Sequence, residues 1–226
     1  MPKLFIVATP IGNLKDVTLR AIETLKSVDV VLAEDTRVTR KLLAHLGISK
    51  PTISFREHSS PKILEKILNL IKENKNLALV TDAGTPGISD PGRKLIAYLE
   101  AELPSGSSAS VIPIPGPSAL SAIVSASDID LSNFIFLGFP PRKKGRQTFF
   151  GRVAKINMPV IIVESPHRVQ KTLRELEVAN GDRYVNIGRE LTKLHEEIFR
   201  GKLSEAQKHF TGERQRGEFT IIIDTK

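Results

Sequence analysis

The chain has 226 residues, of which 40% are hydrophobic and 26% charged, as in an ordinary globular protein. Its net charge of +8 favours an anionic partner such as nucleic acid, although charge alone also fits a basic protein without one. The absence of cysteine excludes disulfides, thiolate metal sites and cysteine nucleophiles. The first apolar run, residues 4–8, is too short for a signal segment or a membrane span, so we expect a cytoplasmic protein.

The first half of the chain alternates short apolar runs with amphipathic segments. Apolar runs predict strands over residues 4–8, 30–33, 77–80 and 111–114. Helical spacing of apolar residues predicts helices over residues 17–28, 39–46, 61–72 and 91–100, and Pro61 suits the first turn of the third. Apolar strands separated by helices indicate a parallel sheet that is covered on both faces.

The order of elements changes in the second half. A small-residue helix is predicted over residues 118–127 and a second helix over 168–177. Strands are predicted over residues 134–138, 160–163, 184–188 and 219–224. We therefore expect a mixed α/β domain with some antiparallel pairing, and we place the domain boundary near Gly116, giving domains of residues 1–115 and 116–226.

Three turns rich in Gly and Pro each follow a predicted strand of the first half, at residues 9–13, 82–92 and 113–118. Ligands of open α/β sheets bind beyond the carboxyl ends of the strands, and such turns let the backbone approach a ligand closely. Each turn on its own is also explained as a tight connection. The turns contain no GxxxxGK[ST] and no GxGxxG, so an ATP or NAD site has little support.

Charged residues cluster after several predicted strands, at residues 34–37, 164–168 and 189–193. The ends of strands are where site residues gather, but each of these charges could equally cap a helix or form a surface ion pair. His58 and His167 lack the spacing of metal ligands, so no metal is assigned.

Residues 140–146 form a basic segment, in which four cations fall within five residues. Such a cluster suits a phosphate backbone, because each contact releases counterions. The alternative is a solvated loop. Phe149 and Phe150 follow, and they could stack on bases, although core packing is the commoner role for phenylalanine.

With these motifs in order, the whole chain resembles the bacterial ribosomal RNA small subunit methyltransferase I family, a branch of the tetrapyrrole methylase superfamily. The motifs that carry the resemblance are ATPIGNL at 8–14, AEDTR at 33–37, TDAGTPGISDPG at 81–92, PIPGPSAL at 113–120, PRKKG at 141–145, ESPHR at 164–168, GRELTK at 188–193 and RGEF at 216–219. Val38 departs from the family pattern, which commonly has histidine there, and Ser59, Ser60 and Arg93 also differ from it.

The resemblance implies a two-domain α/β fold with S-adenosylmethionine in the cleft between the domains, and a homodimer. The implied reaction is 2′-O-methylation of cytidine 1402 in 16S ribosomal RNA within the small ribosomal subunit. Two rival functions stay open. One is methylation of a tetrapyrrole or another small molecule, because a fold alone does not fix a substrate. The other is a non-catalytic RNA-binding or ribosome-assembly protein, against which the three turns argue.

Site residues follow from the motifs and the resemblance. The group that takes the proton from the ribose hydroxyl, or orients that hydroxyl, is expected among Asp35, Glu164, Glu190 and Lys193, and a lysine could act as the base only with a lowered pKa. The expected cofactor contacts are Pro10, Asp82, Gly84, Thr85, Ile88, Ser89, Pro117, Ser118 and Ala119. RNA contacts are expected at Arg37, Arg142, Lys143, Lys144, Arg146 and Arg168.

Overall fold

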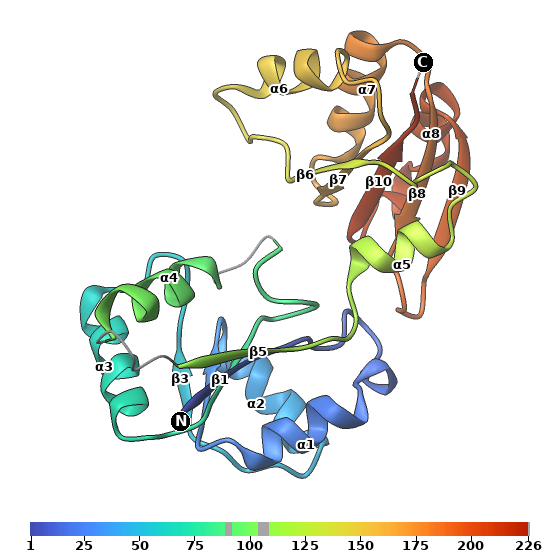
Figure 1. Cartoon of the computed structure of the whole chain (residues 1–226). Coiled ribbons are helices and arrows are strands. Elements are labelled where there is room, and N and C mark those ends of the chain that lie inside the picture. Colours follow the sequence, from blue (N-terminus) through green and yellow to red (C-terminus); the bar gives the residue numbers. More distant parts are fainter. Residues whose placement is uncertain (89–91, 104–108, 226) are drawn as a thin grey trace. The chain divides into compact units, whose positions relative to one another are not determined.

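The computed structural model describes residues 1–88, 92–103 and 109–225. The chain divides into two compact units, residues 1–118 and residues 119–226, which are treated separately below (Figure 1). The first unit contains a parallel sheet and the second a mixed sheet, so the expected α/β class is confirmed.

The first unit is built on a five-stranded parallel sheet with the order β3-β2-β4-β1-β5. Its central strands are buried and almost wholly apolar, as expected for strands covered on both faces. Leu79 of β4 pairs with Ile6 of β1 on one side and Leu32 of β2 on the other. The strands are β1 (Lys3–Val7), β2 (Val30–Ala33), β3 (Thr52–Ser54), β4 (Leu77–Val80) and β5 (Ser110–Ile114).

Helices cover both faces of this sheet (Figure 1). The apolar stripes of α3 and α4 pack on one face around Phe55, which is fully buried. The stripes of α1 and α2 pack on the other face through Ala21, Leu25 and Leu43. The helices are α1 (Leu19–Ser27), α2 (Thr36–His45), α3 (Pro61–Lys72) and α4 (Arg93–Glu102), and a short 3-10 turn, η1 (Leu14–Asp16), precedes α1.

Capping residues decide where α1 and α2 begin. The hydroxyl of Thr18 accepts a hydrogen bond from the backbone N–H of Ala21, so α1 starts at Leu19 rather than at residue 17 as the apolar pattern predicts. Asp35 caps α2, which therefore begins three residues before the expected residue 39. The expected start of α4 at Pro91 lies outside the described residues.

The second unit contains a five-stranded mixed sheet with the order β6-β7-β10-β8-β9. Only β6 and β7 are parallel; the other neighbouring pairs are antiparallel. The last strand lies at the centre, where Ile221 pairs with Ile162 and Ile187. The strands are β6 (Ile135–Gly138), β7 (Val160–Glu164), β8 (Tyr184–Arg189), β9 (Glu197–Lys202) and β10 (Phe219–Ile223).

Three helices pack on one face of the second sheet and α5 lies on the other (Figure 1). Ile123 of α5 comes so close to Gly188 of β8 that a Cβ added there would lie 2.8 Å from its side chain. Phe149 and Phe150 belong to the buried core, so of the two roles the sequence left open, core packing and stacking on bases, the structure shows core packing. The helices are α5 (Ala119–Ser125), α6 (Arg146–Val153), α7 (Val169–Asn180) and α8 (Leu203–His209), and η2 (Gly212–Gln215) precedes β10.

Two further observations bear on function. None of the helices in residues 1–88, 92–103 and 109–225 is both long and apolar enough to span a membrane. The same residues hold no group of three or more His, Asp or Glu side chains arranged to bind a metal ion.

Candidate functional site

Two backbone hydrogen bonds tie the turn after β1 to the turn after β4. The N–H of Thr9 donates to the carbonyl of Gly84 at 2.9 Å, and the N–H of Gly84 donates to the carbonyl of Thr9 at 3.0 Å. The hydroxyl of Thr9 donates to the carbonyl of Thr81 at 3.2 Å. Gly84 has a φ of 84°, which L side chains rarely adopt. The two turns therefore form one fixed edge at the carboxyl ends of the strands.

The turn after β5 joins the same edge. The hydroxyl of Thr85 donates to the carbonyl of Pro117 at 3.1 Å. A Cβ added to Gly116 would lie 3.0 Å from the Cβ of Ala8, so glycine permits this close approach. The structure thus brings seven of the nine expected cofactor residues to one edge of the first unit. Ala119 begins α5 in the second unit, and Ser89 lies outside the described residues.

Two side chains at this edge are of the kinds that contact nucleoside ligands. Asp82 is exposed and offers a carboxylate to a hydroxyl or an ammonium group. Ile88 is 41% exposed and offers apolar surface to a flat ring. The residues present therefore fit a nucleoside-type cofactor. Its expected position in a cleft between two domains stays a prediction.

A pocket of about 310 Å³ opens beside this edge, within the first unit. Its walls come from the turn after β1, from the start of the turn after β4 and from α2. Pro10 and Asp82 of the expected cofactor group line it, together with Val38 and Thr39.

Asp35 caps α2 and pairs with Arg37. Its carboxylate accepts from the backbone N–H of Arg37 at 2.8 Å and from its guanidinium at 2.5 Å. These hydrogen bonds hold the pKa of Asp35 well below its usual range. Asp35 therefore both caps α2 and forms an ion pair with Arg37, the two structural roles that the sequence left open. Its low pKa makes it a weak proton acceptor.

Glu34, the neighbour of Asp35, has the opposite electrostatics. Burial, and after it the carboxylate of Asp82, raises the pKa of Glu34, although a hydrogen bond from the backbone N–H of Asp82 and the charge of Arg56 oppose this. Glu34 is not among the four expected bases. The sequence places both Glu34 and Asp35 directly after a strand, but it does not show which of the two caps α2.

Glu164 lies in a buried ion network of the second unit. Its carboxylate pairs with the guanidinium of Arg168 at 2.6 Å and accepts from the hydroxyl of Thr172 at 2.6 Å. That hydroxyl in turn accepts from Arg146, whose guanidinium also binds Glu175 at 2.6 Å. The side chain of Glu164 has no exposed surface, so this network gives it a structural role.

The same network separates the expected RNA contacts into two groups. Arg142, Lys143 and Lys144 are exposed, as a phosphate-binding loop requires. Arg146 is 4% exposed, and its guanidinium donates to the carbonyl of Pro141. Arg168 likewise donates to the carbonyl of Pro140. The position of Arg146 and Arg168 therefore suits them to holding the base of the loop rather than to binding RNA directly.

Glu190 and Lys193 come together in the turn between β8 and β9. The ammonium of Lys193 binds Glu190 and Glu218, each at 2.9 Å. Burial alone would lower the pKa of Lys193, but these two carboxylates outweigh it and raise the pKa. Lys193 therefore lacks the lowered pKa that a lysine would need to act as the base. Burial would raise the pKa of Glu190, but the hydrogen bonds from Lys193 and Glu218 lower it.

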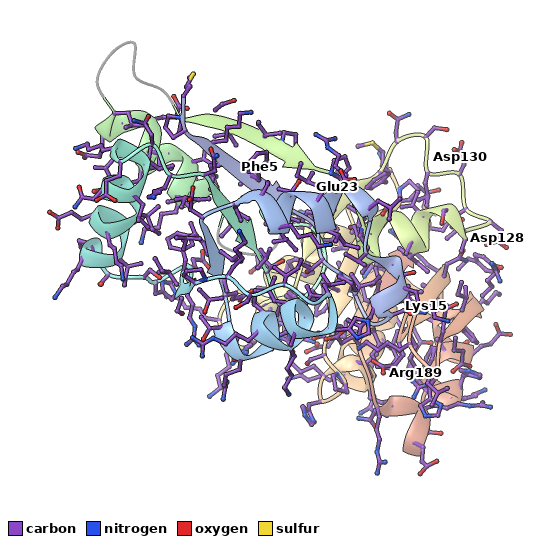
Figure 2. All side chains as sticks on the ribbon, turned by 90° about the horizontal axis from the view of Figure 1, so that it is seen from below. Phe5, Lys15, Glu23, Asp128, Asp130 and Arg189 are labelled. Atoms are coloured by element: carbon purple, nitrogen blue, oxygen red, sulfur yellow. The ribbon has the colours of Figure 1, made fainter. Side chains whose placement is uncertain are left out.

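Arg189, labelled in Figure 2, fixes the loops around this pair. Its guanidinium donates to the carbonyls of Arg216 at 2.7 Å and His195 at 3.2 Å. A Cβ added to Gly217, whose φ is 102°, would lie 2.4 Å from Glu190, so glycine is required next to that carboxylate. The expected Glu190 and Lys193 are thus held rigidly side by side.

The network around Glu164 yields a stability prediction. Replacing Arg168 by Met should destabilise the protein by about 3 kcal/mol, because Glu164 would keep a buried charge without its closest cation. The exposed Lys171→Met should cost less than about 0.5 kcal/mol. Urea unfolding followed by circular dichroism measures both.

A double variant measures the energetic coupling between Glu164 and Arg168. Combining Glu164→Gln with Arg168→Met should cost less than the sum of the single changes, because a neutral amide no longer needs a cation. Strict additivity would show that the two side chains are not energetically coupled.

Comparison with known proteins agrees with this architecture. The family model for Tetrapyrrole (Corrin/Porphyrin) Methylases matches residues 3–207. A protein of Thermotoga maritima named ribosomal RNA small subunit methyltransferase I is 48% identical over 226 residues, covering all of both chains. A protein of the same name from Bacillus subtilis is 40% identical and covers 98% of this chain and 74% of its own length.

Solved structures show the same fold at low identity. The cobalamin biosynthetic enzyme cobalt precorrin-4 methyltransferase superimposes with a TM-score of 0.73 at 19% identity, covering 98% of this chain and 94% of its own. Uroporphyrin-III-C-methyltransferase from Thermus thermophilus gives 0.67 at 15% identity, covering 98% and 94%. The chain thus belongs to the ribosomal RNA small subunit methyltransferase I family, within the tetrapyrrole methylases.

Proposed function

We propose that this protein transfers a methyl group from S-adenosylmethionine to ribosomal RNA of the small subunit. In finer detail, we propose that the acceptor is the 2′-oxygen of cytidine 1402 in 16S ribosomal RNA. The observation that carries the proposal is the similarity along the whole chain to relatives named for this class of reaction. The exposed basic loop, the net charge of +8 and the three joined turns support it independently.

The carboxyl edge of the first unit would hold the cofactor. Asp82 would accept from a hydroxyl or ammonium group, and Ile88 would contact the adenine, with Gly84 and Thr85 keeping the turn in place. When bound, S-adenosylmethionine supplies a methyl group on a positively charged sulfur, which needs no further activation. The protein must then align the acceptor oxygen and remove its proton.

A ribose hydroxyl is a poor nucleophile at neutral pH, so a nearby proton acceptor would speed its attack. Of the carboxylates at this edge, Glu34 has the raised pKa that suits proton transfer, and we propose it as the base. Asp35 would hold the start of α2 beside it. Glu190 and Lys193 form a charged pair that could orient the hydroxyl, and Glu164 would support the basic loop through Arg168.

The RNA would be bound through exposed cations. Arg142, Lys143 and Lys144 lie together before α6, and Arg37 presents an 82% exposed guanidinium that Asp35 holds in place. We propose that the substrate is the RNA within the small ribosomal subunit, met in the cytoplasm, and that the enzyme acts as a homodimer.

Transfer of a labelled methyl group tests the function. Small ribosomal subunits lacking the modification are incubated with labelled S-adenosylmethionine, and the labelled nucleotide is mapped. The proposal predicts label on a cytidine 2′-oxygen. Label on an added tetrapyrrole but not on RNA would favour the rival methylase, and failure to bind S-adenosylmethionine would favour a non-catalytic RNA-binding protein.

The basic loop yields a prediction about salt. Replacing Arg142, Lys143 and Lys144 by Ala should weaken binding to the subunits and lower the slope of log K against log salt by about one for each lost phosphate contact. A matched variant loses three exposed lysines of α3, Lys62, Lys66 and Lys72. Equal slopes for the two variants would show that binding to the subunits depends on net charge and not on the position of the basic loop.

Glu34 yields a pH prediction. A carboxylate accepts protons only when ionised, so the wild-type kcat should fall as pH falls through the raised pKa of Glu34. Glu34→Gln should lower kcat about 10²- to 10⁴-fold and remove this acidic limb, while cofactor affinity stays unchanged.

The control for Glu34 is Glu23→Gln, an exposed carboxylate on α1 that is labelled in Figure 2. It should leave both kcat and its pH profile as in the wild type. Full turnover by Glu34→Gln with an unaltered acidic limb would remove Glu34 as the base.

A further inference from the structure

We propose that the pocket between the turn after β1 and helix α2 receives the nucleoside that is methylated, an inference that rests on the proposed function. The pocket has a volume of about 310 Å³, at the small end of ligand sites and suited to one nucleoside rather than to a macrocycle of four pyrrole rings. Its apolar walls are Pro10 and Leu14 on one side and Val38 and Leu42 on the other.

An unpartnered hydroxyl points to a ligand in this pocket. Thr39 lines the pocket, is 3% exposed, and its Oγ1 has no hydrogen-bond partner in the part of the chain that the structure describes. Other buried threonines satisfy this group: the hydroxyl of Thr9 donates to Thr81, and that of Thr24 donates to the carbonyl of Arg20 at 2.7 Å. A buried hydroxyl without a partner is costly, and a ligand group or an ordered water that a ligand can displace would complete it.

The charged groups of the pocket match a nucleotide. Asp82 lines it, and its Oδ1 accepts from the backbone N–H of Asp35 at 2.9 Å, which fixes the carboxylate. A carboxylate has two oxygens that each accept more than one hydrogen bond, so Asp82 can accept from the exocyclic amine of cytosine as well as from the cofactor. Hydroxyls bind either kind of base edge. Lys41 is exposed on the wall formed by α2, where an ammonium can bind a phosphate. The apolar walls would contact the faces of the base.

The position of the pocket also suits methyl transfer. Pro10 and Asp82 line it and are at the same time among the proposed cofactor residues. A nucleoside held there would lie beside the methyl donor. A pocket of this size can admit a nucleoside only after it has left the base stack, so the target nucleotide must be turned out of its RNA.

Thr39→Val tests the hydroxyl. The variant should raise KM for small subunits lacking the modification about five- to tenfold, without weakening S-adenosylhomocysteine binding in calorimetry and without lowering stability in urea. A merely structural Thr39 would leave KM unchanged. The matched control is Thr24→Val, whose hydroxyl is satisfied inside α1; it should change stability alone.

Val38→Trp tests the rim of the pocket. Val38 is 42% exposed, so a larger side chain there would obstruct the mouth without disturbing the core. KM should rise at least tenfold while Kd for S-adenosylhomocysteine stays as in the wild type. Ala44→Trp, also exposed on α2 but not lining the pocket, should behave as wild type.

The outcomes separate this inference from the proposed function. If the wild type labels ribosomal RNA but Thr39→Val and Val38→Trp keep a normal KM, the pocket is not the nucleoside site and the function stands. If Kd for S-adenosylhomocysteine weakens along with KM in both variants, the pocket belongs to the cofactor instead. If the wild type labels no RNA, both proposals fall.

Discussion

The reciprocal backbone hydrogen bonds between Thr9 and Gly84 are the constraint on which the rest of the candidate site depends. They join two turns that follow neighbouring parallel strands, and the bond from Thr85 to Pro117 adds the third turn. Because each turn follows a strand of the parallel sheet, these hydrogen bonds hold the three turns together at its carboxyl edge. It carries seven of the expected cofactor residues, and two of them, Pro10 and Asp82, also line the 310 Å³ pocket. Proposals about cofactor, acceptor and base all rely on this one rigid edge.

The expected charged residues of the second unit lie in ion pairs, one of the roles that their sequence positions left open. Glu164 is enclosed by Arg168 and Thr172, and Lys193 is held between two carboxylates that raise its pKa. Glu164 has no exposed surface to offer a substrate, and Lys193, whose pKa is raised, is a poor proton acceptor. A raised pKa in a carboxylate is found instead at Glu34, in the first unit. The group that we propose as the base therefore belongs to the first unit, whereas these ion pairs belong to the second.

Helices and strands with a regular spacing of apolar residues could be predicted from the sequence, and those without it could not. The helix Pro61–Lys72 and the strands Val30–Ala33 and Leu77–Val80 have the predicted bounds, because their apolar spacing is unbroken. The strand Glu197–Lys202 was missed, since it lies at the sheet edge and mixes charged with apolar residues. The sequence could not show that Arg146 is buried while its basic neighbours are exposed. Its partners Thr172 and Glu175 lie far along the chain. The joined turns were foreseen as a group, but the pocket depends on tertiary contacts that no local motif encodes.

Hydrogen exchange with and without S-adenosylhomocysteine tests most directly the claim that the carboxyl edge of the first unit holds the methyl donor. The account predicts that protection on binding is concentrated at residues 9–13, 82–88 and 113–118, the described parts of the three turns. The strands beneath them should change little, because they are already buried. Protection that left these turns unchanged and appeared elsewhere, for example around residues 189–193, would contradict the account.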